Sequence, residues 1–166
     1  VPSEYDWTLA NDQLLGIDVT PIQLAGCIQQ VDPIVFRGDI CPGAAWDENR
    51  LDLFQSFDVS INFGFIDTDD RGIALVFQTV GTGALGNRLG YEGITPSLAV
   101  HIDNHFDSNE NDPSFDHVSL MANGSVMHST GNEVSGPVQA LVSGASLTNG
   151  HYLRVRWNAA SSTMDI

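Results

Sequence analysis

An acidic segment near the middle of the chain carries residue types that bind metal ions. Residues 98–121 read LAVHIDNHFDSNENDPSFDHVSLM, where an apolar run enters an aspartate-rich loop. The loop carries Asp103, Asp107 and Asp112, and His117 opens the next apolar run. Carboxylate oxygens on one loop suit calcium, and an imidazole beside them suits a second, softer metal. The segment therefore predicts a metal site in preference to a merely solvated acidic loop.

Strand patterns dominate the rest of the chain, and no amphipathic helix longer than two turns is predicted. The predicted strands alternate with period two or are apolar on both faces: residues 57–63, 72–77, 97–100, 118–121, 125–127, 138–142 and 153–157. Asn123-Gly124 is a typical hairpin dipeptide. With 16 glycines and 7 prolines between short strands, the pattern predicts one all-β domain over residues 1–166, an antiparallel β-sandwich.

Composition excludes several classes of partner. The chain has 21 acidic and 6 basic residues, all six of them arginine, and a formal net charge of -15. No basic patch is available to neutralise phosphates, so we expect no nucleic-acid partner and no attraction to anionic membranes. An apolar run long enough to span a bilayer is also absent from the sequence.

Two cysteines, Cys27 and Cys41, lie close together in a stretch with glycine and proline. They do not form a CxxC motif, which argues against a redox or zinc motif. A disulfide that closes this short loop is the preferred interpretation and fits an exported domain, whereas two buried thiols are the alternative.

Together these stretches resemble the L-type (legume-type) lectin domains of the concanavalin A-like sandwich superfamily, and most closely their bacterial cell-surface branch. The resemblance covers about two-thirds of the chain, from residue 46 to residue 166, and is carried by residues 57–63, 71–78, 81–86 and 89–100, the acidic loop, and residues 150–157. It implies a jelly-roll sandwich, here without its closing C-terminal strands. It also implies a non-enzymatic protein that binds glycans or polysaccharides with Ca²⁺ as cofactor.

The resemblance also implies roles for the loop residues. Asp103 and Asp112 would bridge calcium and a second transition metal, manganese or zinc, and His117 would bind the second metal. His105 would offer its backbone carbonyl to calcium, and Asp107 stands at the position of a calcium-binding asparagine. An asparagine offers both an oxygen and an NH2 group, whereas a carboxylate only accepts hydrogen bonds.

His101 departs from the family pattern, which usually has a glutamate ligand for the second metal at this position. A site of two histidines and two aspartates favours zinc, nickel or copper over manganese. The alternative is that His101 is only packed in the core and the second site is not used.

The resemblance places a sugar pocket beside the calcium. Its candidate residues are Asp70, Arg71, Gly81, Gly83, Phe106 and Asp107. The family has an aspartate directly before Gly-Ile-Ala, but here that residue is Arg71, with Asp70 one position earlier. Asp70 either takes this role through a shifted turn or belongs to a polar turn. Gly81 and Gly83 either let a ligand approach the backbone or only make the loop flexible. Phe106 either stacks on a sugar or covers the core.

Two other functions remain open at this point. Glycoside hydrolases of the same fold need a pair of carboxylic acids on one strand, and residues 101–106, HIDNHF, contain no glutamate. Hydrolysis is therefore the weaker alternative. A structural or adhesive module that calcium stabilises without sugar binding is the stronger one. We expect an exported or cell-surface protein, with the domain part of a larger or multimeric assembly because single lectin pockets bind weakly.

Overall fold

The structure, a computed structural model, describes residues 22–32, 35–48, 50–63, 72–139 and 151–166, and for most of β1 and the first half of β2 it describes the backbone alone. The strands are β1 Ile22–Asp32, β2 Val35–Asp47, β3 Phe57–Phe63, β4 Ile73–Gln78, β5 Ser97–Asp103, β6 His117–Ala122, β7 Glu133–Gln139, β8 His151–Asn158 and β9 Thr163–Asp165. Two short 3-10 turns, η1 Arg88–Gly90 and η2 Ser108–Glu110, are the only helical elements of this part of the chain. Within it, no helix is long and apolar enough to cross a bilayer.

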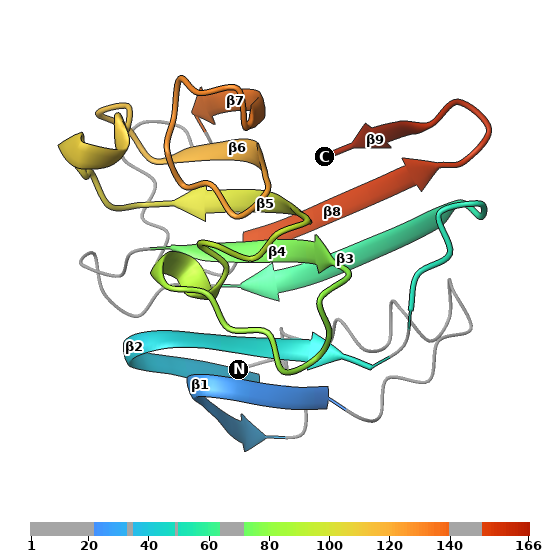
Figure 1. The fold of residues 1–166 in the computed structure, drawn as a ribbon, viewed down its shortest axis with the longest axis horizontal. Helices are drawn as coiled ribbons and strands as arrows, with labels where there is room; N and C mark the ends of the chain where they lie inside the picture. The colour runs from blue at the N-terminus through green and yellow to red at the C-terminus, as the bar shows by residue number, and fades with distance from the viewer. Residues whose placement is uncertain (1–21, 33–34, 49, 64–71, 140–150) are drawn as a thin grey trace.

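Every pairing between these strands is antiparallel, and the pairings form three sheets (Figure 1). β4, β5, β6 and β7 lie in sequence order in a four-stranded sheet, β3, β8 and β9 form a three-stranded sheet, and β1 pairs with β2. β8 pairs with β3 along its length, from Phe57 opposite Trp157 to Phe63 opposite His151. The predicted all-β fold of antiparallel sheets is confirmed, while its jelly-roll connectivity stays a prediction.

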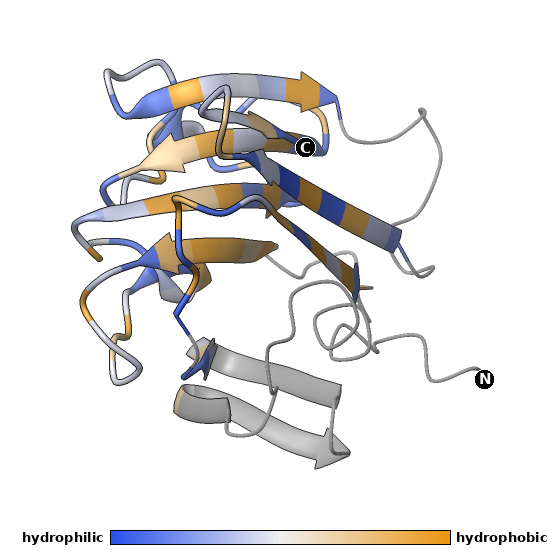
Figure 2. Ribbon diagram, turned by 90° about the vertical axis from the view of Figure 1, so that its right-hand side faces the viewer, coloured by the Kyte–Doolittle hydropathy of each residue, from blue (hydrophilic) through white to orange (hydrophobic). Residues whose placement is uncertain are grey.

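An apolar core joins the two larger sheets. On β8, buried Leu153 and Val155 alternate with two exposed arginines, and Figure 2 shows the alternation along β3 and β8 as bands. These residues pack with Phe63 of β3 and with Val100 and Ile102 of β5. Burying a side chain of this size contributes about 1.5–3 kcal/mol to the stability of the fold. Because period-two patterning puts all these apolar residues on one face of each sheet, their burial holds the two sheets together.

The opposite face of the four-stranded sheet is covered as well, mainly by loops. Ala99 of β5 and Met121 of β6 pack there with Trp46 of β2 and with loop residues such as Tyr91. β5 is therefore buried on both faces, as its apolar sequence predicts. The polar residues at its C-terminal end, His101 and Asp103, are consequently buried too.

The strands predicted around residues 57–63, 72–77, 97–100, 118–121 and 153–157 are confirmed with small shifts of their ends. The prediction of a second hairpin strand at residues 125–127 is wrong. Residues 125–132 form a loop, and β7 is the strand that pairs with β6. Asn123 and Gly124 do form a turn with positive φ angles. The Gly124 carbonyl, however, accepts a hydrogen bond from the Gly93 N–H at 2.9 Å, so the turn joins the covering loops instead of returning along β6.

Several predictions fall outside the described part. The backbone places Cys27 and Cys41 on the paired strands β1 and β2, where the register shifts between Gly26 and Ile28. Their side chains are not described, so the disulfide stays a prediction. Residues 140–142 of the predicted strand at 138–142 also lie outside the described residues, although residues 138 and 139 end β7.

Candidate metal centre

The ends of β5 and β6 place three predicted ligands on one face of the four-stranded sheet. Asp103 pairs in register with His117, and His101 pairs with Ser119. Alternate residues of a strand point to the same face, so His101, Asp103 and His117 all point away from the core between the sheets. All three side chains are buried.

The acidic loop between β5 and β6 is held by its own side chains. Asp107 caps η2, and its Oδ1 atom accepts a hydrogen bond from the Asn109 N–H at 2.9 Å. Asn111 then ends the turn in the left-handed conformation, with φ of 59°, which asparagine tolerates better than most residues. Asp112 folds back so that its Oδ2 atom accepts from the Asp107 N–H at 2.7 Å. The loop is therefore closed by backbone-to-carboxylate bonds.

This loop brings Asp112 to the end of the sheet, beside Asp103 and His117. One ligand atom from each of these three residues lies within 4.8 Å of the others. Asp103 also accepts a hydrogen bond from the His105 N–H at 2.6 Å. The Oδ1 atom of Asp112 is buried and accepts no hydrogen bond. Burying a carboxylate oxygen without a partner is costly, and a bound cation would remove that cost.

A small cavity of about 20 Å³ lies beside the carboxylates. Its lining combines acidic-loop residues with residues of η1: Asp103, His105, Asp107, Glu110, Arg88 and Leu89. Within it, the Arg88 guanidinium forms an ion pair with Glu110. Burial raises the pKa of Glu110 to about 7, and the cation of Arg88 opposes this shift. Sequence reasoning identified neither member of this pair.

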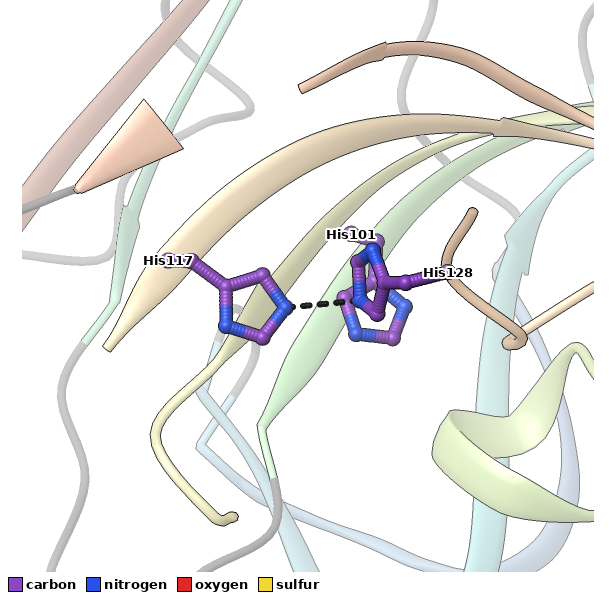
Figure 3. Close-up of side chains that lie close together, drawn as sticks. All are labelled: His101, His117 and His128. Atoms are coloured by element: carbon purple, nitrogen blue, oxygen red, sulfur yellow. Dashed lines mark hydrogen bonds between the residues drawn. The ribbon is translucent and has the colours of Figure 1, made fainter. Parts of the chain in front are cut away.

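A third histidine, His128, was also missed, and it completes a buried cluster with His101 and His117 (Figure 3). One ring nitrogen from each of the three lies within 4.8 Å of the others. The Nε2 atoms of His117 and His128 are 2.9 Å apart. The His128 Nε2 atom is also 3.6 Å from the Oδ1 atom of Asp112. The three side chains are 0% (His101), 1% (His117) and 1% (His128) exposed, so the cluster is shielded from solvent.

His128 lies on the loop between β6 and β7, and the acidic loop fixes its position. Its backbone N–H donates to the Glu110 carbonyl at 2.9 Å. Its own carbonyl accepts from the side-chain amide of Asn111 at 3.4 Å. A loop residue leaves no periodic pattern in the sequence, and the only signal for His128 was an imidazole soon after the Asn123-Gly124 turn.

The outer ring nitrogen of each histidine contacts a polar group outside the cluster. These Nδ1 contacts are His101 with the Tyr91 hydroxyl at 2.8 Å, His117 with the Phe115 carbonyl at 3.2 Å, and His128 with the Glu133 carboxylate at 2.8 Å. Burial lowers the pKa of His117, and the neighbouring His128 lowers it further, which favours a neutral imidazole. Burial alone would raise the pKa of Glu133, but hydrogen bonds from His128 and Ser129 outweigh it and lower that pKa.

The predicted sugar-binding residues are only partly brought to this site. Asp107 lines the cavity, and Phe106 beside it is 59% exposed, so Phe106 does not cap the core. Gly81 and Gly83 lie on an exposed loop after β4 and do not line the cavity. Asp70 and Arg71 lie outside the described residues, so their place at the site stays a prediction.

A comparison of the sequence with models of known protein families finds no matching family. Carboxylate oxygens surround the cavity and imidazole nitrogens meet beside it, which is a donor set for a hard cation next to a softer one.

Proposed function

We propose that this chain is a calcium-dependent carbohydrate-binding domain of the L-type lectin kind, without enzymatic activity. Asp103, Asp112 and His117 converge at the end of the four-stranded sheet, and we base the proposal on this convergence. The resemblance assigns these residues to the metals, and their ligand atoms lie within 4.8 Å of one another. Strand pairing places Asp103 opposite His117, whereas Asp112 is brought to them by the fold of the acidic loop.

The donors around the cavity suit calcium. Asp103, Asp107 and Glu110 line it, and the Oδ1 atom of Asp112 has no hydrogen-bond partner. Calcium prefers six to eight hard oxygen ligands, and carboxylates and backbone carbonyls are its usual protein ligands. When bound, calcium would supply positive charge that neutralises these carboxylates and orders the loop.

The loop would present its outer face to the sugar. Phe106 is exposed beside Asp107, where an aromatic ring can pack against the C–H face of a sugar. Gly81 and Gly83 lie on an exposed loop with open space beside them, since a Cβ added at either position would meet nothing within 4 Å, and a ligand could reach the backbone there. A rigid loop lowers the entropy cost of binding a polar ligand that offers few apolar atoms.

The same proposal includes the setting of the domain. A net charge of -15 with no lysine keeps the surface acidic and argues against nucleic acid or anionic lipid as partners. We propose an exported or cell-surface protein in which several pockets act together, since avidity compensates for weak single sites.

A second candidate is a structural or adhesive module that calcium stabilises without binding sugar. It is favoured by the Arg88–Glu110 ion pair, which lies in the cavity beside the acidic loop and leaves only about 20 Å³ there. In this alternative, the calcium-bound loop only stabilises the end of the four-stranded sheet, and the exposed Phe106 contacts another protein.

A glycan array separates the two candidates. The purified chain would be screened in calcium and again after chelation, with Phe106→Ala as a variant that removes the exposed aromatic ring but none of the proposed calcium ligands. Binding that requires calcium and is lost in the variant supports the lectin. A blank array from protein whose melting temperature still rises with calcium would reject the lectin and favour the structural module.

A further inference from the structure

The three buried histidines share one arrangement, in which the outer Nδ1 atom meets a polar group and the inner Nε2 atom faces the cluster. Which nitrogen carries the proton follows from the partner of the outer nitrogen. A partner that can only accept a hydrogen bond requires an Nδ1–H, and the Nε2 atom of that neutral ring then carries a lone pair.

His117 and His128 both have such partners. The Nδ1 atom of His117 lies 3.2 Å from the backbone carbonyl of Phe115, which only accepts. The Nδ1 atom of His128 lies 2.8 Å from the Oε1 atom of Glu133, a carboxylate whose other oxygen accepts from the Ser129 N–H at 2.7 Å. When both rings are neutral, each Nε2 atom carries a lone pair, and the two Nε2 atoms lie 2.9 Å apart.

His101 follows the same rule through a tyrosine. The hydroxyl of Tyr91 donates its single proton to the carbonyl of Ser125 at 2.9 Å. The Tyr91 oxygen must then accept from the Nδ1–H of His101, 2.8 Å away. The Nε2 atom of His101 is left with a lone pair that faces the Oδ2 atom of Asp103 at 3.2 Å.

With all three rings in the neutral state, the interior of the cluster therefore contains hydrogen-bond acceptors only. Three Nε2 lone pairs, the Asp103 carboxylate and the partnerless Oδ1 atom of Asp112 meet in a region from which solvent is excluded. Water cannot relieve this repulsion at buried positions, and burying unpaired acceptors is costly. A cation held by the three imidazoles would satisfy their lone pairs, and the Oδ1 atom of Asp112 lies 3.6 Å from the Nε2 atom of His128.

We propose that the cluster binds one borderline divalent transition-metal ion, with Zn²⁺ as the preferred ion, through the Nε2 atoms of His101, His117 and His128. The inference rests on the metal centre of the proposed function and deepens it, but it does not require a sugar. Three imidazoles favour zinc, copper or nickel over manganese and calcium, which prefer oxygen. Asp112, whose Oδ1 atom is 3.6 Å from the His128 Nε2 atom, is the candidate fourth ligand.

The observed spacing suits such an ion. Zinc bonds imidazole nitrogen at about 2.0–2.1 Å in a tetrahedron, so two ligating nitrogens stand about 3.3 Å apart. The 2.9 Å between His117 and His128 opens to that value with a small rotation of either ring. The Nδ1 contacts to Tyr91, Phe115 and Glu133 are the outer hydrogen bonds that usually orient histidine ligands of a metal.

The test is a zinc titration of the full chain after treatment with a chelator, in calcium-containing buffer, by calorimetry. The expected result is one zinc ion per chain. His128→Ala should weaken binding at least tenfold, and Glu133→Gln, which retains the imidazole but weakens its orienting bond, should weaken it about 10–100-fold. His151→Ala on β8, in the other sheet, is the matched control and should bind like the wild type.

Nitrogen NMR of the histidines gives a second measurement that does not depend on the variants. On adding zinc, the Nε2 signals of His101, His117 and His128 should shift, while those of His105 and His151 should not. Absence of stoichiometric binding, wild-type affinity in folded His128→Ala, or shifts confined to His105 and His151 would overturn the proposal. If His128→Ala does not fold, Glu133→Gln and the NMR shifts decide.

This experiment separates the inference from the proposed function. Zinc binding with a blank glycan array would support the three-histidine site and reject the lectin. Calcium-dependent glycan binding in a chain that binds no zinc would overturn the three-histidine site and leave the lectin supported.

Discussion

His128 lies eleven residues beyond His117 on a loop, yet its Nε2 atom is 2.9 Å from the Nε2 atom of His117. The strand and the loop meet because the backbone of His128 is hydrogen-bonded to the acidic loop at Glu110 and Asn111. The acidic loop therefore both supplies carboxylates and positions the third imidazole. A change in either part of the site should affect the other.

Asp112→Asn should abolish calcium binding and lower the calcium-dependent gain in stability. The amide keeps the shape of the side chain but removes the charge of a carboxylate whose Oδ1 atom has no hydrogen-bond partner. In wild-type protein, calcium at a hundred times its dissociation constant should add about 2.7 kcal/mol to the free energy of unfolding. Thermal unfolding with and without calcium measures this gain. Asp116→Asn, on the same loop, is the control and should keep it; equal gains in both variants would remove Asp112 from the site.

Arg88→Gln should destabilise the calcium-free protein and enlarge its response to calcium. The substitution leaves the Glu110 carboxylate, whose side chain is 7% exposed, without its cation. An uncompensated buried charge costs about 1–3 kcal/mol or more, and added calcium could replace the missing charge. Urea unfolding with and without calcium gives both quantities.

The double variant Arg88→Gln with Glu110→Gln is the control for this prediction. Removing both charges should recover most of the stability lost in Arg88→Gln, because no buried charge is left unpaired. If the double variant is as unstable as the single one, the loss comes from packing and not from the ion pair.

Gly124→Ala should destabilise the fold and weaken zinc binding together. Gly124 has φ of 67°, and an added Cβ would lie 2.5 Å from the Ile94 backbone nitrogen. We expect a loss of about 1–3 kcal/mol from this strain, and a displaced His128 because the same turn begins its loop. Gly131→Ala is the matched control, since nothing lies within 4 Å of its added Cβ. Chemical denaturation of both variants makes the comparison, and equal stabilities would contradict it.

Asp58→Asn should reduce the stability of the protein at neutral pH but not in acid. A hydrogen bond from Arg154 lowers the pKa of Asp58 below its ordinary value of 3.8. The contribution of this pair is therefore present above the unfolded-state pKa and is lost as the pH falls through the folded-state pKa. The pair is partly exposed, so we expect an effect below about 1 kcal/mol.

Asp165→Asn provides the comparison for Asp58→Asn. Asp165 lies 3.6 Å from Arg156 in a more exposed pair, so its loss should leave stability unchanged from acid to neutral pH. Denaturant unfolding at pH 7 and near pH 3 tests both variants. A constant difference between Asp58→Asn and wild type at the two pH values would contradict the assigned cause.

The sequence predicts the sheets better than it predicts the loops that cover them. β8 could be recognised because Leu153 and Val155 alternate with arginines, and β5 because it is apolar on both faces. The strand expected at 125–127 failed because the Asn123-Gly124 turn bonds to Gly93 and not to a returning strand. Hairpin dipeptides specify a turn, but tertiary hydrogen bonds decide where the chain goes next.

At the candidate site, too, some residues could be predicted from the sequence and others could not. Asp103, Asp112 and His117 could be found because they cluster in one segment of the sequence. His128 and the Arg88–Glu110 pair could not, because loop contacts that carry no periodic pattern bring them in. Only their distances in the fold bring them to the candidate site.

Elemental analysis of the chain after chelation, exposure to calcium and zinc together, and dialysis tests the metal centre most directly. We predict that each chain retains calcium at the acidic loop and zinc at the three histidines. Asp112→Asn should lose the calcium and hold zinc more weakly, because Asp112 is also the candidate fourth zinc ligand, whereas His128→Ala should lose the zinc. A folded wild-type chain that retains neither ion would contradict the assignment of this loop and these histidines as a metal centre.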